Sequence, residues 1–416
     1  MTIVDTVSLL NRFVATRQHT ENLCKHLLLE DYHLQPTEDV SPPKWHLAHT
    51  TWFFEEFILA QFKDYQRVHS EYAFLFNSYY ESVGTRWQRA ARGDLSRPPV
   101  ADIYAYRHQV NGAIERYFEQ LSHPQRQLLE LGLHHEQQHQ ELLLTDLKYS
   151  LGLNPMHPVY VPQTPPEHTE AEAMAAPVQW LNLPEGVYEV GYEGSEFAFD
   201  NELNRHKVYI NPCEIASRPV SNREYLAFIE TGGYQAFEHW LSDGWDWVQS
   251  EHIIAPLHWH KKSDGWHRYT LQGLIPLDLD APVTHISYFE ADAYARHRGL
   301  RLPTEFEWEV ATQLYEPAPA EQNHTVEKNY WEPVPHTGFF GNVWEWTHSA
   351  YLTYPGFRQS PGAVGEYNGK FMNGQYVLRG GSCVTPLDHI RATYRNFFMP
   401  DKRWQFTGVR LVRHTH

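Results

Sequence analysis

The chain has 416 residues, of which 42% are hydrophobic and 20% are charged. Domains commonly contain ~150 residues, so this length predicts two or three domains with sizeable cores. Lys and Arg number 34 against 51 Asp and Glu, and the net charge of −17 argues against binding to nucleic acid or anionic membranes. No apolar run approaches the ~18 residues of a membrane span, and the N-terminus lacks a signal or transit pattern. Three Cys cannot form a disulfide framework, so we expect a cytoplasmic protein.

Residues 1–153 have the helical hydrophobic periodicity of a four-helix bundle. The second helix is predicted to begin at Ser41, which would be its N-cap, with two prolines in the first turn. An irregular insert over 64–98 separates the second helix from the third and ends in an arginine-rich run. The expected helices are 4–29, 41–62, 102–121 and 124–151.

Residues 154–178 are rich in Pro, Ala and Glu, which predicts a linker. From residue 179 to 416 the sequence changes to short β-like runs, turn residues and many Trp and Gly. The chain is therefore predicted to be multidomain and α+β, with a helical bundle followed by a mixed domain. The elements expected in the second domain include strands at 187–191 and 207–210 and helices at 221–230 and 289–298.

The 27 His are unusually many, and one segment spaces them for metal binding. His135 and His139 lie four residues apart on a predicted helix, so they project from one face about a turn apart. A third ligand is expected on a facing helix, where His46 and His49 are both candidates and periodicity does not choose between them. Three neutral imidazoles without a carboxylate favour an oxygen-activating Fe(II) site over a hydrolytic zinc site. The alternative is a pair of buried, hydrogen-bonded histidines.

The same segment matches the His-Glu-x-x-His pattern of zinc proteases, in which Glu136 would be the general base. Leu142 and Thr145 occupy positions where the extended metzincin motif requires Gly and His. A glutamate ligand further along would have to come from the Pro-rich linker. A protease is therefore disfavoured, and we expect Glu136 to point away from the metal-binding face.

Motifs in both parts of the chain match one family of two-domain enzymes. Residues 45–50 (WHLAHT) and 135–141 (HEQQHQE) resemble the DinB-like bundle of the ergothioneine-biosynthesis sulfoxide synthases. The C-terminal part resembles the formylglycine-generating-enzyme (sulfatase-modifying factor) domain, which has a C-type-lectin-like fold. Its matching segments are 301–309 (RLPTEFEWE), 341–347 (GNVWEWT) and 378–382 (LRGGS). The combination of the two modules in this order makes the resemblance specific.

This resemblance implies that His49, His135 and His139 hold one Fe(2+), which selects His49 over His46. It implies a hercynine oxygenase that joins the imidazole C2 of hercynine (Nα-trimethylhistidine) to the sulfur of cysteine or γ-glutamylcysteine, using O2, and yields a sulfoxide. The substrates supply all four electrons, so no external reductant or organic cofactor is expected. The implied partners are these small molecules, without nucleic acid or membrane, and a homo-oligomer stays open.

Further substrate contacts are implied by motif position. Gln138 matches the residue that hydrogen-bonds the substrate imidazole, and Asn396 and Phe397 match the stretch that holds the betaine. Some relatives carry Trp and then Asp where this chain has Phe397 and Phe398, so their γ-glutamylcysteine contacts are not transferred. Only Cys383 follows the Gly-Gly-Ser turn, so the C-terminal domain is not expected to oxidise cysteine, and its Trp and Gly motifs are expected to form core.

Residues 76–86 (FNSYYESVGTR) resemble the subgroup of these synthases whose active site carries a tyrosine pair. At least one of Tyr79 and Tyr80 is therefore expected in the iron pocket, where a phenol arrives protonated at neutral pH and can supply a proton. Arg86 and Arg89 follow in the basic run and are expected to clamp the carboxylate of the thiol substrate.

Both domains are expected to supply walls of the active site, because pockets between domains are common ligand sites. The bundle would provide the metal and the tyrosines, and Asn396 and Phe397 would close the pocket. Other functions stay open: a zinc-dependent thiol transferase or hydrolase built on the same His, as in other DinB-like proteins, or a ligand-binding protein with a structural metal. Within the synthase class, a selenium donor or ovothiol-type coupling is also open.

Overall fold

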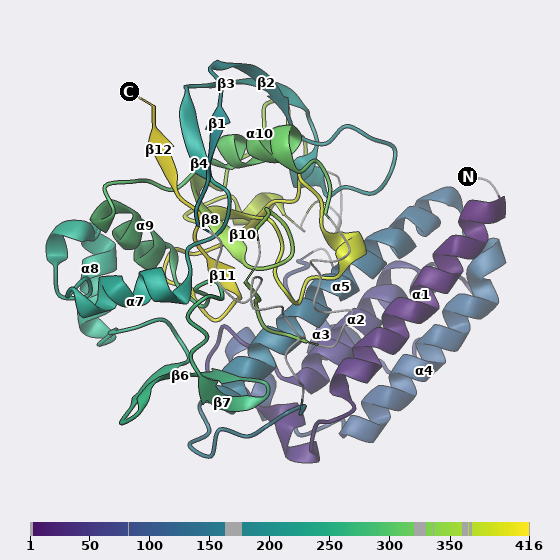
Figure 1. Cartoon of the computed structure of the whole chain (residues 1–416). Coiled ribbons are helices and arrows are strands. Elements are labelled where there is room, and N and C mark those ends of the chain that lie inside the picture. Colours follow the sequence, from purple (N-terminus) through teal and green to yellow (C-terminus); the bar gives the residue numbers. More distant parts are fainter. Residues whose placement is uncertain are drawn as a thin grey trace. The chain divides into compact units, whose positions relative to one another are not determined.

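The computed structural model describes residues 3–81, 83–162, 177–319, 330–335, 337–359, 365 and 368–415. These residues divide into two compact units, one formed mainly by the chain up to Met156 and the other mainly by residues from His157 onward (Figure 1). None of the described helices is long and apolar enough to cross a lipid bilayer.

The predicted linker, 154–178, lies partly outside the described residues, at 163–176. Residues 154–162 were expected to be linker, but the chain from His157 onward already belongs to the second unit. The backbone N–H groups of Tyr160 and Val161 donate to the carbonyl of Leu271 at 2.8 and 3.1 Å. Tyr160 is buried, so this segment gains both hydrogen bonds and an apolar contact by packing there.

The first unit is the predicted bundle of four long helices. Helices α1 and α2 pack on α5, and α4 packs on α2. Helix α1 ends earlier than predicted because Leu28 and Leu29, which extend the apolar pattern, are exposed and lie beyond it. The four bounds are α1 (Ile3–Cys24), α2 (Pro43–Phe57), α4 (Val100–Tyr117) and α5 (His123–Gly152).

The insert between α2 and α4 contains short helical segments joined by loops. Helix α3 (Tyr72–Phe76) packs on α2. The turn after it is held by Asn77, whose side chain accepts from the backbone N–H of Tyr80 at 3.1 Å and donates to its carbonyl at 3.0 Å. The 3-10 segments of the unit are η1 (Leu29–His33), η2 (Leu59–Gln61), η3 (Arg89–Asp94) and η4 (Phe118–Gln120).

Helices α2 and α5 approach each other closely at Gly132. A Cβ atom at this position would lie 2.5 Å from Cε1 of Phe54 and 3.0 Å from Cε1 of Phe53. Real side chains do not tolerate such distances, so the approach of the two helices depends on this glycine. Gly132 lies about one turn before His135 along α5, so the contact fixes the spacing of the two helices that carry the histidines.

The second unit is α+β, with small sheets and short helices, as predicted. One sheet has the order β1-β4-β12 and another the order β10-β9-β8-β11. Strands β2 and β3 form a two-stranded antiparallel sheet, and β5, β6 and β7 form a three-stranded sheet in that order. The strands are β1 (Trp180–Leu183), β2 (Gly186–Val190), β3 (His206–Ile210), β4 (Cys213–Ala216), β5 (Trp259–Lys262), β6 (Gly265–Thr270), β7 (Gly273–Pro276), β8 (Trp344–Ala350), β9 (Tyr376–Arg379), β10 (Asn396–Phe398), β11 (Thr407–Gly408) and β12 (Val412–His414).

The helices of this unit begin at sequence-encoded caps. Ser221, Ser287 and Thr304 each accept a hydrogen bond from the backbone N–H of a glutamate three residues later. The predicted helices at 221–230 and 289–298 and the two predicted strands are confirmed to within a residue or two. The bounds are α7 (Asn222–Glu230), α8 (Ser242–Ser250), α9 (Tyr288–His297) and α10 (Glu305–Tyr315), with 3-10 segments η5 (Asp200–Glu202), η6 (Phe237–His239), η9 (Gly369–Phe371) and η10 (Leu387–His389).

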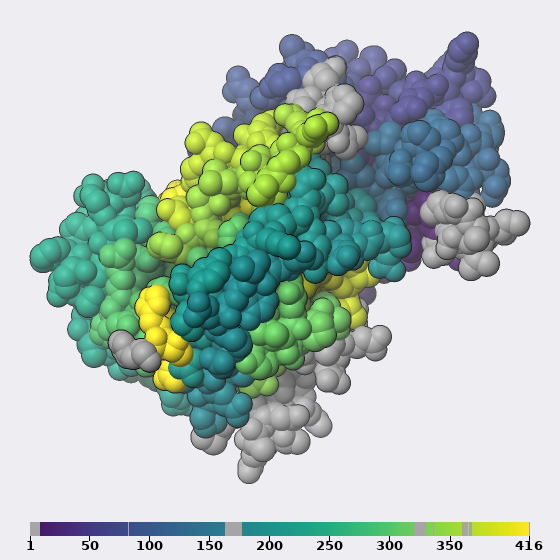
Figure 2. All heavy atoms as spheres, turned by 90° about the horizontal axis from the view of Figure 1, so that it is seen from above, coloured from purple at the N-terminus to yellow at the C-terminus, as the bar shows by residue number. Residues whose placement is uncertain are grey.

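The tryptophan motifs form the core of the second unit, as expected. Trp308, Trp344 and Trp346 are fully buried, and the indole of Trp308 donates to Oε2 of Glu345 at 2.6 Å. The C-terminal strand β12 pairs with β4, so the last residues lie beside the first strands of the unit, as Figure 2 shows where the yellow end meets the teal segment.

Replacing Gly132 with Ala is expected to lower the free energy of unfolding by about 1–3 kcal/mol, because the new methyl group overpacks the contact with Phe53 and Phe54. Urea unfolding followed by circular dichroism measures this change. Gly112→Ala in α4 is the matched control, since a Cβ there meets nothing within 4 Å. Alanine should stabilise that helix. Equal stability of Gly132→Ala and the wild type would contradict the expected close approach.

Candidate metal centre

Three imidazoles from two facing helices meet inside the bundle. His49 lies on α2, and His135 and His139 lie on α5. One ring nitrogen from each lies within 4.8 Å of those of the other two. The ring centroids are 5.0, 4.8 and 4.7 Å apart. Within the described part of the chain, no other group of three His, Cys, Asp or Glu side chains meets this spacing.

His49 presents one nitrogen that has no partner. Its Nδ1–H donates to the carbonyl of Phe76 at 2.6 Å, which leaves the lone pair on Nε2. Nε2 is buried and has no hydrogen-bond partner among the described residues. Trp45 and Trp52 both stack on this imidazole, with centroids 4.4 and 5.4 Å away. A buried polar atom without a partner is unfavourable by itself, so Nε2 is suited to a ligand from outside the protein.

His139 is supported by a second histidine and a carboxylate. His46 Nε2 lies 3.0 Å from Oδ2 of Asp146, and His46 Nδ1 lies 2.8 Å from Nδ1 of His139. A carboxylate accepts, so we assign the proton of His46 to Nε2 and that of His139 to Nδ1. His139 then has its lone pair on Nε2. Both nitrogens of His46 are occupied by hydrogen bonds to Asp146 and His139, which leaves His49 as the available metal donor on α2.

Desolvation keeps all three imidazoles uncharged, with His49 and His135 buried and His139 half-buried. Desolvation lowers the pKa of His135 to about 3. Desolvation, followed by the charges of neighbouring histidines, lowers the pKa values of His49 and His139 well below 6.5. Three neutral nitrogen donors and no carboxylate within the group fit a divalent transition metal that keeps open positions.

Glu136 points away from this cluster, as expected, into a buried ionic group. Its carboxylate accepts from Arg17 on α1 at 2.8 Å, from Thr20 at 2.6 Å and from Arg107 on α4. Burial by itself raises the pKa of Glu136, but the charges and hydrogen bonds of Arg107 and Arg17 outweigh this and hold it at about 2. A carboxylate fixed in this way cannot act as the general base of a zinc protease.

The tyrosine pair lies one aromatic ring away from His49. The rings of Tyr79 and Tyr80 stack at 4.6 Å, and their hydroxyl oxygens are 3.5 Å apart. Tyr80 is buried and its ring centroid is 5.6 Å from that of Trp52, which in turn stacks on His49. The bond from His49 to Phe76 also ties this loop directly to the imidazole. The structure therefore brings the tyrosine loop to the α2 side of the cluster.

The other expected substrate contacts on the bundle have protein partners. Arg86 is exposed and pairs with Glu81. Arg89 is also exposed and donates to the carbonyls of Glu38 and Asp39 at 3.0 and 2.7 Å. Gln138 is half-buried next to His139 in α5.

Asn396 and Phe397 lie on β10 in the second unit. The side-chain oxygen of Asn396 accepts from the backbone N–H of Phe397 at 2.9 Å. Tyr351 stacks on Phe397 with ring centroids 4.0 Å apart. Both residues are half-buried.

Sequence reasoning did not identify the residues that support the ligands. Asp146 lies seven residues after His139 and thus on the same helix face, which was an available signal for its role. Arg92, buried against Trp45, carried no local signal that set it apart from the other arginines of its run.

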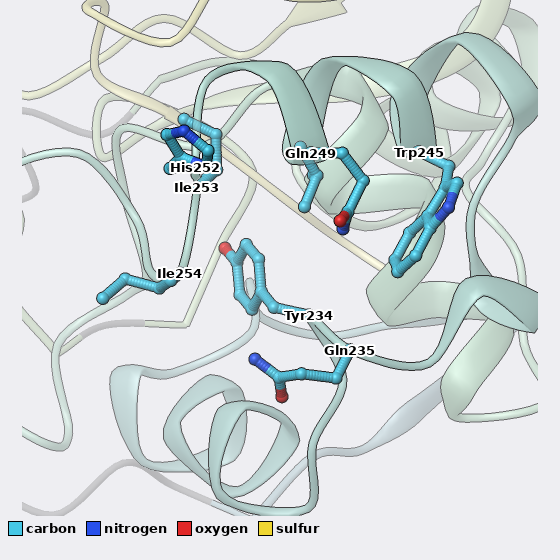
Figure 3. Close-up of a pocket in the computed structure, with 8 residues that line it drawn as sticks. Tyr234, Gln235, Trp245, Gln249, His252, Ile253 and Ile254 are labelled. Carbon is cyan, nitrogen blue, oxygen red and sulfur yellow. The ribbon is translucent and has the colours of Figure 1, made fainter.

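A separate pocket of about 370 Å³ lies in the second unit. Trp245 and Gln249 project from α8, and Gln235 lies across the pocket from them (Figure 3). The hydroxyl of Tyr234 already donates to Glu290 at 2.6 Å. This pocket gathers no group of metal ligands, so we place the candidate chemistry at the histidine cluster.

Comparison with known proteins identifies the family. Residues 166–333 and 332–415 match the sulfatase-modifying factor enzyme 1-like domain. The hercynine oxygenase of Mycolicibacterium smegmatis is 30% identical over 357 residues, which cover 78% of this chain and 80% of that protein. The chain belongs to the hercynine oxygenase family.

Other relatives in this family match a shorter part of the chain. The hercynine oxygenase of Mycobacterium tuberculosis is 34% identical over 52% of this chain and 56% of its own length. That of Mycolicibacterium thermoresistibile is 33% identical over 52% of this chain and 54% of its own length. The chain thus spans about half the length of these two relatives. The domain match also bears out the expected fold of the C-terminal part.

Replacing His135 with Phe is expected to reduce the acid sensitivity of the metal-free protein. The pKa of His135 is about 3 in the folded chain against an ordinary value of 6.5, so between these pH values only the unfolded chain binds a proton there. The free energy of unfolding therefore falls as the pH drops below 6.5, by up to ~1.4 kcal/mol per pH unit for this group, and is unaffected above it.

Urea titrations at about pH 7.5 and about pH 5 measure this slope for the wild type and the variant. The variant should have the shallower pH dependence. His123→Phe is the control, because His123 is exposed and should leave the slope unchanged. Equal slopes in the wild type and His135→Phe would show that His135 is not held neutral.

Proposed function

We propose that this protein is an iron-dependent oxygenase of ergothioneine biosynthesis that couples hercynine to cysteine or γ-glutamylcysteine. The observation that carries the proposal is the group of three neutral imidazoles without a carboxylate, two of them buried and one half-buried, in a member of the hercynine oxygenase family. Two substrate hydrogens, on imidazole C2 and on sulfur, are lost as the carbon–sulfur bond forms. One oxygen atom of O2 enters the sulfoxide and the other leaves as water, which balances four electrons.

His49, His135 and His139 would hold Fe(2+) through one nitrogen each. The bound ion supplies redox chemistry with O2 and lowers the pKa of a coordinating thiol. The remaining ring N–H of His49 is fixed by a backbone carbonyl and that of His139 by His46, so these rings cannot rotate freely or donate a proton. The water hydrogens balance those lost from sulfur and imidazole C2, so another group would have to pass a proton to oxygen and regain one from the substrates.

Tyr79 and Tyr80 are the groups to which we assign that proton. A phenol is protonated at neutral pH and can deliver a proton at little energetic cost. Their loop is anchored at Phe76 to His49 and stacks on the same aromatic side of the cluster. We retain both residues as candidates, because their hydroxyls are 3.5 Å apart and can relay a proton between them.

Substrate contacts complete the proposal. Gln138 would bond the substrate imidazole, and Arg86 and Arg89 would bind the carboxylate of the thiol substrate. Arg86 would exchange its exposed partner Glu81 for this carboxylate, which costs little, since surface ion pairs contribute only ~0–1 kcal/mol. Asn396 and Phe397 would receive the betaine end of hercynine, with the aromatic ring facing the trimethylammonium group.

Metal analysis combined with product analysis tests this function. The purified protein, loaded anaerobically with Fe(2+), is exposed to O2 with hercynine and each thiol in turn, and products are identified by mass spectrometry. A sulfoxide from either thiol, accompanied by O2 uptake, is the expected result. His49→Asn should lose both metal and activity, and His123→Asn, at an exposed position, should retain them. Bound zinc with no O2 uptake would favour a hydrolase or thiol transferase instead.

Replacing the tyrosines tests the proton assignment. Phe at Tyr79 or Tyr80 should lower the rate of sulfoxide formation by ~10²-fold or more where the transfer is direct. Flux should divert toward oxygenation of the thiol alone, because O2 and the thiol still bind. Tyr104→Phe, elsewhere in the bundle, is the control and should change neither rate nor product ratio. A double Tyr79→Phe, Tyr80→Phe variant with wild-type rate and product ratio would show that the pair only packs.

A further inference from the structure

Arg92 is a buried cation without a carboxylate partner. Arg92 is 4% exposed, and no carboxylate of the described residues lies within ion-pair distance of it, although the charge of Asp146 acts on it from further away. The guanidinium donates to Oγ of Ser41 at 2.9 Å and to Oγ of Ser78 at 3.0 Å. Its central carbon lies 3.4 Å from the ring centroid of Trp45. Burying an unpaired charge is unfavourable, so this arrangement needs an explanation beyond stability.

The first contact of Arg92 leads to His49. Trp45 contacts both groups: the guanidinium lies over its ring, and the same ring stacks on His49 at 4.4 Å with an interplanar angle of 12°. The guanidinium therefore limits where Trp45 can move, and Trp45 limits the tilt of the His49 ring.

The second contact leads to His139. Ser41, whose hydroxyl accepts from Arg92, donates its backbone N–H to Oδ2 of Asp146 at 2.8 Å. The same oxygen accepts from His46, which bonds His139. The position of Ser41 at the start of α2 thus affects the carboxylate that orients the second ligand.

The third contact leads to the tyrosine loop. Ser78 directly precedes Tyr79, and it lies two residues after Phe76, whose carbonyl fixes Nδ1 of His49. Three separate parts of the site therefore converge on one side chain: the aromatic support of His49, the hydrogen-bonded support of His139 and the tyrosine loop.

We infer that Arg92 is a positioning residue that holds His49, His139 and the tyrosine loop in one mutual geometry. This inference rests on the proposed metal-binding function. A guanidinium suits this position, because its planar group can lie over the indole of Trp45 while its N–H groups donate to two hydroxyls. An ammonium group at the same place keeps the charge but loses the plane and the fork.

Charge and position predict opposite effects on metal affinity. The positive charge of Arg92 repels a nearby cation, so removing the charge alone would tighten metal binding. Removing a residue that orients ligands loosens binding, typically by ~10–100-fold. Arg92→Met removes both charge and geometry, and Arg92→Lys keeps the charge. We expect both variants to bind Co²⁺ ~10–100-fold more weakly than the wild type.

Competition with a chromophoric chelator measures Co²⁺ affinity in the full-length protein, and visible absorption reports the geometry around the bound ion. We expect the absorption bands of both Arg92 variants to shift. Arg67→Met is the matched control, since Arg67 is a surface arginine of the same unit paired with Glu56, and it should change neither affinity nor spectrum. Tighter binding by Arg92→Met with unchanged Arg92→Lys would overturn positioning in favour of charge. A lower unfolding temperature with wild-type affinity would overturn it in favour of packing.

Two serine variants keep the inference testable where Arg92 variants fail to fold. Ser41→Ala and Ser78→Ala each remove one hydroxyl that accepts from the guanidinium. Each should weaken Co²⁺ binding less than Arg92→Lys does, and the double variant should approach it. Wild-type affinity of the double serine variant would refute the inference.

Chemical rescue separates shape from charge. Guanidinium added to Arg92→Ala at concentrations below those that unfold the protein should restore Co²⁺ affinity, whereas methylammonium should not. Restoration by methylammonium would show that charge alone is required. The wild type distinguishes failure of the metal function from failure of the positioning role: if it binds no Co²⁺, the proposed metal function fails. If it binds Co²⁺ and the Arg92 variants bind equally well, only the positioning role fails.

Discussion

Removing three imidazoles from water is the constraint on which the interior of the bundle depends. Desolvation keeps His49, His135 and His139 uncharged, so their lone pairs are available, but each buried ring also carries an N–H group that needs an acceptor. A backbone carbonyl at Phe76 serves His49, and the side chain of His46 serves His139. The polar residues around the cluster are therefore part of its construction rather than incidental.

The same constraint explains how charge is distributed in the bundle. Glu136, adjacent in sequence to a proposed ligand, is neutralised by Arg17 and Arg107 on the side away from the cluster. Its negative charge is compensated locally and does not enter the ligand group. Among the described residues, the carboxylate of Asp146 reaches the cluster through His46. The ligand group itself remains neutral, which suits a divalent ion and an anionic thiolate better than a site already filled with carboxylates.

Sequence reasoning identified the parts of this site that are encoded locally. The four-residue spacing of His135 and His139 on a helix fixed their common face. The cap predicted for the second helix was wrong, because Pro42 is the N-cap and the hydroxyl of Ser41 accepts from Arg92 instead. The choice between His46 and His49 was not local, because it depends on Asp146, a hundred residues further along, engaging His46. Arg92 was missed for the same reason, since its partners Ser41 and Trp45 lie on another element. The end of α1 was predicted too late because Leu28 and Leu29 continue the helical apolar periodicity, although both are exposed and lie beyond the helix.

The groups that hydrogen-bond His49 and His139 differ in charge, and this difference makes the two imidazoles unequal as metal donors. His139 is backed, through His46, by the carboxylate of Asp146, and an anionic partner raises the basicity of an imidazole donor. His49 is backed by the neutral carbonyl of Phe76, at the start of the tyrosine loop. An ion held here would therefore meet a stronger donor on the His139 side and a weaker one where the chain also carries the tyrosines. His49, the weaker donor, is thus the ligand whose support lies in the same loop as the tyrosines assigned to proton transfer.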